Sequence, residues 1–110
     1  MTKTLLVALM LTTAAGSALQ ADVKTGQKYY LKSLKSKLGM NGTQFAAQHT
    51  QDEWEALFDN RGEGFIQEYS NRYPDTKTFL QNPKSWKKLQ HIRDFAIEYG
   101  SDSGNVPSCG

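Results

Sequence analysis

The sequence predicts a small all-α protein, because its apolar residues recur at helical spacing and no segment alternates as a strand does. Leu31, Leu34 and Leu38 are separated by three and four residues, and Trp54 and Phe58 by four. Such offsets place side chains on one face of a helix. We therefore expect one helical bundle of roughly three to five helices.

The first 21 residues have the order of features found in a bacterial secretory signal peptide. Lys3 precedes an apolar run from Leu5 to Leu11, and small residues follow as far as Ala21. Signal peptidase cleaves after small residues of this kind, so we expect cleavage after Ala21, with Ala18 as the alternative. The apolar run is shorter than the ~20 residues of a membrane-spanning helix. The expected product is a periplasmic protein that does not stay inserted in the membrane.

Removal of these residues leaves 89 residues, which is enough for a single domain with a modest core. We expect that domain over residues 22–100, followed by a polar C-terminal tail over residues 101–110. The net charge is +2 for the whole chain and close to zero without Lys3. Such a balance does not favour nucleic acid or an acidic membrane surface as the partner.

The first helix of the domain is expected from Thr25, which would cap it, to about Leu38. Residues 22–24 would form a short lead-in, and Tyr30 and Leu34 would lie on the buried stripe. Lysines cover much of the remaining helix surface, and they are Lys28, Lys32, Lys35 and Lys37. We interpret these lysines as a solvated face.

A glycine-rich break over residues 39–42 ends the first helix. Residues 43–48 are expected to add one turn of helix that places Phe45 in the core. Thr50 and Glu53 then have the spacing of a capping box, in which each side chain binds the other residue's backbone N–H. The aromatic residues that follow at helical spacing predict that the next helix buries one face.

That helix is expected to end in a turn over residues 59–64, followed by a short helix over residues 65–69. A loop is expected from residue 71 to residue 83, because Pro74 and Pro83 punctuate it. The last helix would begin near Pro83 and run to Tyr99, with glycine following in the C′ position. Its buried stripe consists of Trp86, Leu89, Ile92, Ala96 and Tyr99.

Few residues carry the chemistry of a site. Two histidines without metal-ligand spacing give no reason to expect a metal site. His49 stands just before the capping box, and we expect it to pack on Trp54 as a hydrophobic staple does. His91 is expected at the edge of the buried face of the last helix. No nucleophile–base pair or carboxylate dyad is apparent, so we do not expect an enzyme.

The order of motifs resembles that of small class I c-type cytochromes of the bacterial periplasm. A helix with Gly26 and Tyr30 leads to a glycine-rich break, then to the segment from His49 to Trp54, and then to an aromatic last helix. Residues 102–109, Asp-Ser-Gly-Asn-Val-Pro-Ser-Cys, are similar to the end of a group of short exported cytochrome-c-like proteins. The resemblance covers essentially the whole mature chain and implies a cytochrome-c-like arrangement of helices.

The chain departs from these proteins at the haem-attachment motif. Residues 38–42, where Cys-x-x-Cys-His would stand, are Leu-Gly-Met-Asn-Gly. Covalent haem in its usual form is therefore excluded. The resemblance also implies that relatives have a cysteine at the position of Leu38, paired with the one that matches Cys109, and that this chain has lost the bridge.

Two functional hypotheses follow from the resemblance. The first is a haem-free accessory or binding protein without a cofactor, whose partner is a periplasmic protein such as a component of a redox chain. The alternative is an electron carrier with non-covalently bound haem, in which His49, His91 or Met40 provides the axial ligands. That alternative requires an apolar slot between the first and last helices.

Cys109 is the single cysteine of the chain and cannot form an internal disulfide. We therefore expect it to form intermolecular disulfides on air oxidation, which would give a Cys109-linked dimer. Non-reducing gels should show this dimer for the wild-type protein and not for a Cys109→Ser variant. Equal dimerisation of the variant would contradict the prediction.

Overall fold

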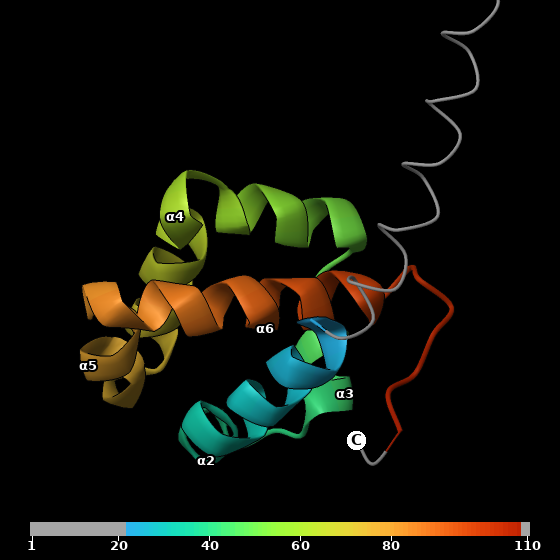
Figure 1. Ribbon diagram of the computed structural model, residues 1–110, viewed down its shortest axis with the longest axis horizontal. Coiled ribbons are helices and arrows are strands. Elements are labelled where there is room, and N and C mark those ends of the chain that lie inside the picture. The colour runs from blue at the N-terminus through green and yellow to red at the C-terminus, as the bar shows by residue number, and fades with distance from the viewer. Residues whose placement is uncertain (1–21, 109–110) are drawn as a thin grey trace, which may run out of the picture.

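The computed structural model describes residues 22–108, and these residues contain helices and no strand (Figure 1). The predicted all-α fold is confirmed. The predicted signal peptide and Cys109 lie outside the described residues. Within the described part of the chain, no helix is both long enough and apolar enough to cross a membrane.

The first helix, described over residues 22–33, is followed by α2 (Lys35–Leu38) and α3 (Gly42–Ala46). Within the described residues the longest element is α4 (Gln51–Arg72), and α5 (Lys77–Leu80) and α6 (Trp86–Glu98) complete the described helices. Two 3-10 turns, η1 (Pro74–Thr76) and η2 (Pro83–Ser85), precede α5 and α6. The helices outnumber the predicted three to five, because two of them are additional four-residue segments.

The last helix, α6, occupies the middle of the molecule. It packs between α4 on one side and the first helix with α3 on the other (Figure 1). The first helix crosses α6 at Gly26, where a Cβ would collide with the carbonyl oxygen of His91 and stand 2.9 Å from the Cβ of Phe95. Only a glycine permits this close contact between the two helices.

The core is largely aromatic. Its fully buried side chains include Tyr30, Phe45, Trp54, Phe65, Tyr69 and Phe95. The indole N–H of Trp54 donates a hydrogen bond of 2.9 Å to the carbonyl oxygen of Ala46 at the end of α3. The single polar atom of the buried Trp54 side chain therefore has a partner. The ring of Phe45 lies between Tyr30 and Trp54, with centroid distances of 4.3 and 4.9 Å. These contacts join α3 and α4 to the first helix.

A reversal divides α4 into two helical halves, over residues 51–58 and 63–72. Asp59 is extended, and Asn60, Arg61 and Gly62 are left-handed, with φ of 53°, 57° and 74°. The turn predicted over residues 59–64 therefore occurs. It brings Phe58 onto Phe65 of the second half, and their rings stack at a centroid distance of 4.5 Å.

The capping box that starts α4 is confirmed. The N–H of Glu53 donates to the Thr50 hydroxyl at 3.2 Å, and the N–H of Thr50 donates to the Glu53 carboxylate at 2.8 Å. This second bond favours the charged carboxylate and holds the pKa of Glu53 below its usual value. A further capping box, formed by Asn41 and Gln44, starts α3.

Two predicted boundaries of the first helical region were wrong. The first helix is already formed at residue 22, so Thr25 lies inside it and does not cap its start. The helix is also interrupted at Leu34, whose φ of −121° separates it from α2. Lys28, Lys32, Lys35 and Lys37 are exposed, as expected of a solvated face.

The loop predicted over residues 71–83 was also wrong, because much of this segment forms short helices. Proline is favoured in the first turn of a helix, since its missing N–H has no intrahelical partner there. Pro74 and Pro83 start η1 and η2 in this way, and the side chain of Asn82 accepts a hydrogen bond from the N–H of Lys84. Between them, α5 buries Leu80 in the core.

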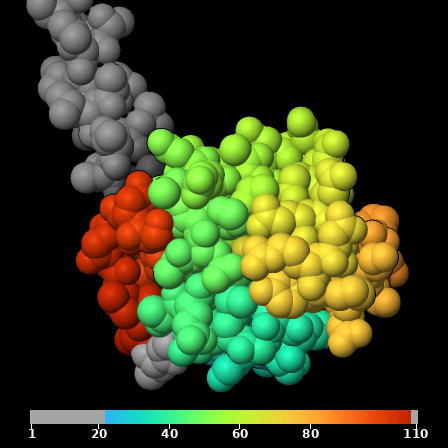
Figure 2. Space-filling model, turned by 180° about the vertical axis from the view of Figure 1, so that it is seen from behind, coloured from blue at the N-terminus to red at the C-terminus, as the bar shows by residue number. Residues whose placement is uncertain are grey.

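The C-terminal segment lies on the domain along its described length (Figure 2). The N–H of Ser101 donates to the carbonyl of His49, and the N–H of Gln51 donates to the Asp102 carboxylate, both at 2.9 Å. At the far end, the Gln27 amide donates to the carbonyl of Ser108 at 2.9 Å, and Pro107 is buried. The polar tail therefore joins the start of α4 to the first helix.

The two tryptophans differ in burial and should differ in their contribution to stability. Trp54 is fully buried, whereas Trp86 is partly buried beneath the guanidinium of Arg61, 5.5 Å from its ring centroid. We expect Trp54→Ala to lower the free energy of unfolding by about 3–5 kcal/mol. Trp86→Ala should cost clearly less. Urea denaturation of both variants would measure this, and equal losses would contradict it.

Candidate functional site

His49 lies between the two halves of α4. Its Nε2 is 2.9 Å from the carboxylate of Glu68 in the second half, and its Nδ1 is 3.5 Å from that of Glu53 in the first half. Its ring packs edge-on against Trp54 at a centroid distance of 4.8 Å, so the predicted staple is confirmed. Both ring nitrogens thus face carboxylates, and the side chain helps to hold the two halves of α4 together.

Met40 lies in the turn between α2 and α3, and its side chain is partly buried against the core. Its carbonyl oxygen accepts a hydrogen bond of 2.6 Å from the hydroxyl of Tyr30. Burial raises the pKa of this hydroxyl well above its usual value, so Tyr30 stays protonated and continues to donate. Met40 also borders a surface pocket of about 370 Å³ together with Leu31 and Gln44.

His91 lies on α6, at the edge of its buried face as predicted, and is 29% exposed. Its Nδ1 is 3.4 Å from the carboxylate of Asp22 at the described start of the first helix. Its ring is tilted against that of Tyr29 at a centroid distance of 5.7 Å. His91 therefore faces the first helix, whereas His49 faces α4.

The three residues named as axial ligands have different neighbours in the described structure: Tyr30 for Met40, the two halves of α4 for His49, and the first helix for His91. Non-covalent haem would also need a slot between the first helix and α6. These described helices leave no such slot where they cross, because they touch at Gly26. The aromatic side chains that would line such a slot are packed against one another instead. Haem binding between these helices would require them to separate.

A pocket of about 430 Å³ lies between the first half of α4 and the end of α6. Phe58 and Ile97 supply its apolar surface, and its charged lining consists of Glu55, Asp59, Arg93, Asp94 and Glu98. The guanidinium Nε of Arg93 donates to Asp94 at 3.2 Å, so the single cation is already paired with one of the four carboxylates. The pocket therefore favours positively charged groups.

A second, more polar groove borders the reversal of α4. It has a volume of about 620 Å³, and Asn60, Gln67, Asn71 and Gln81 contribute amide side chains to its lining. The hydroxyl of Ser70 also lines this groove, is buried, and has no hydrogen-bond partner within the described chain. The groove can therefore offer hydrogen bonds in several directions but has no strong charge preference.

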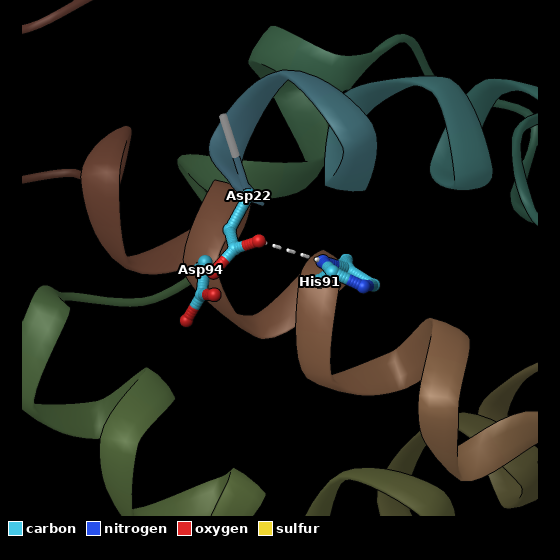
Figure 3. Close-up of side chains that lie close together, drawn as sticks. All are labelled: Asp22, His91 and Asp94. Carbon is cyan, nitrogen blue, oxygen red and sulfur yellow. Dashed lines mark ion pairs between the residues drawn. The ribbon is translucent and has the colours of Figure 1, made fainter. Parts of the chain in front are cut away.

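His91 also belongs to a group of three side chains that offer metal-ligating atoms (Figure 3). Asp22 comes from the first helix, and His91 and Asp94 are three residues apart on α6. One ligand atom from each residue lies within 4.8 Å of the other two. Sequence reasoning missed this group, because most of the domain separates Asp22 from His91 along the chain.

Comparison of the chain with protein-family models, with curated proteins and with solved structures finds no match. The protein is therefore characterised by its fold and by the sites described above. It is a small all-α domain with an aromatic core, an acidic pocket and a histidine–aspartate group.

Proposed function

We propose that this protein is an exported, haem-free accessory protein that binds a partner, and that its acidic pocket receives a cationic group of that partner. The observation that carries the proposal is the pocket between α4 and α6, with four carboxylates and a single guanidinium in its lining. The expected partner is a periplasmic protein, for example a component of a redox chain, that presents a lysine or arginine side chain.

The charges of the pocket support this assignment. Glu55 and Asp59 approach from α4, and Glu98 from α6, so negative charge borders the pocket from both elements. Complementary charge steers association and selects among partners. Phe58 and Ile97 offer an apolar surface for the aliphatic stem of a lysine or arginine, whose charged head would stay near the carboxylates.

The haem-free part of the proposal has separate support. Residues 38–42 contain neither cysteine nor histidine, so the usual covalent attachment is not available. Gly26 lets the first helix touch α6. This contact fills the space that an electron carrier with non-covalently bound haem would need between the two helices. His49 is also engaged by Glu53 and Glu68 and would have to give up these contacts to act as an axial ligand.

Titration with an acetylated and amidated tri-arginine peptide would test the pocket. We expect the wild-type protein to bind this peptide with an affinity that falls as salt is added. Replacement of Glu55 and Glu98 by Gln should weaken binding by about tenfold or more, because charged hydrogen bonds contribute roughly 1.5–3 kcal/mol each.

The matched control is Glu63→Gln, which neutralises an exposed carboxylate that lines the other groove. Heteronuclear NMR would identify the residues whose signals move. Perturbation of residues 93–98 in the wild type and its loss in the double variant would support the proposal. Equal binding by the wild type and the double variant would show that the pocket is not the binding site.

A visible absorbance spectrum tests the haem-free assignment. The protein should be exported in cells that make c-type cytochromes and then purified, and we expect no haem bands. A Soret band that persists through purification would contradict the proposal and support the electron carrier. Its survival in acid–acetone would show covalent attachment and would make our interpretation of residues 38–42 wrong.

A further inference from the structure

We propose that Asp22, His91 and Asp94 form a binding site for a divalent cation of the zinc type. This inference does not depend on the proposed function, because the acidic pocket would receive a partner's side chain with or without a metal ion. Only Asp94 belongs to both sites.

The geometry provides three ligands of suitable chemistry (Figure 3). An imidazole nitrogen and two carboxylate oxygens lie within 4.8 Å of one another, so a small inward movement would let one ion contact all three. Zinc accepts such nitrogen and oxygen donors, and sites with three protein ligands leave the fourth position to water. The imidazole makes the site less suited to Mg²⁺ and Ca²⁺, which prefer oxygen ligands throughout.

A second observation concerns the hydrogen bonding of His91. The Nδ1 atom of His91 is buried and has no hydrogen-bond partner in the described structure, although Asp22 lies 3.4 Å away. Buried polar atoms without a partner are uncommon, because the loss of their hydration is not compensated. A cation bound between Asp22 and His91 would satisfy this nitrogen.

The carboxylates of the group also favour a bound cation. Asp22 and Asp94 place ligating oxygens within 4.8 Å of each other, and like charges at this distance repel. Arg93 lies beside Asp94, with 3.2 Å between its Nε and Oδ1, and it offsets part of this repulsion. A carboxylate has two oxygens, so a metal ion and Arg93 can share Asp94.

A bound ion would connect the described start of the first helix to α6. The Asp22 side chain is 45% exposed and lies at the described start of the first helix. His91 and Asp94 both lie within α6. Metal binding would therefore stabilise the folded chain, because an ion that binds only the folded state raises its stability. Cleavage after Ala21, which the sequence predicts, would add the α-amino nitrogen of Asp22 as a further donor.

Isothermal titration with Zn²⁺ and thermal melts with and without Zn²⁺ would test the site. All proteins should carry Cys109→Ser, so that a thiolate cannot bind the metal. We expect the parent protein to bind Zn²⁺ and to melt at a higher temperature in its presence. Asp22→Asn and His91→Gln should each lower the affinity by at least about tenfold.

The matched control is His49→Gln, because His49 also has two carboxylates beside it. This variant should keep the affinity for Zn²⁺ and the shift in melting temperature. Asp22→Asn preserves the shape of a partly exposed side chain, so circular dichroism should show that it folds normally. An absence of Zn²⁺ binding by the parent, equal binding by His91→Gln, or loss of binding in His49→Gln would each overturn the proposal.

The two proposals fail independently. Substitution of Glu55 and Glu98 leaves the three metal-ligating residues unchanged, and substitution of Asp22 and His91 leaves the lining of the pocket unchanged. The tri-arginine titration in the absence of metal therefore reports on the pocket alone.

Discussion

Residues 59–62 reverse the direction of α4, and the packing of the aromatic core follows from this turn. It holds Asn60 and Arg61 in the left-handed region, which asparagine tolerates but which costs a residue such as Arg61 roughly 1–2 kcal/mol. In return, Phe58 stacks on Phe65, and Trp54 comes within 6.1 Å of both Phe65 and Tyr69. Each aromatic pair contributes about 0.5–1.5 kcal/mol beyond its burial, so the stacked core compensates for the strained turn.

The reversal and the crossing at Gly26 together position the two candidate sites. Because α4 folds back on itself, its first half runs beside the end of α6 and encloses the acidic pocket between Glu55 and Glu98. Because Gly26 lets the first helix approach α6 closely, Asp22 reaches His91. The α6 helix contributes to both sites, and Asp94 lies where they meet.

The structure gives the sequence-identified candidates different surroundings. His49 joins the two halves of α4 through Glu53 and Glu68, which accounts for its position before the capping box. Met40 is held through its carbonyl oxygen by Tyr30. Only His91 has a buried ring nitrogen without a hydrogen-bond partner in the described chain, and it has acidic neighbours from two helices.

Features that depend on neighbouring residues could be predicted without the structure: the all-α class, the capping box at Thr50, the turn after Phe58, and the buried residues Leu89, Ile92 and Ala96 of α6. Local hydrogen bonds and helical periodicity fix these features, so they can be predicted from short segments. The short helices near Pro74 were missed, because proline both ends and begins helices. The acidic pocket and the contact of Asp22 with His91 could not be predicted in this way, since both depend on how helices far apart in the sequence pack together.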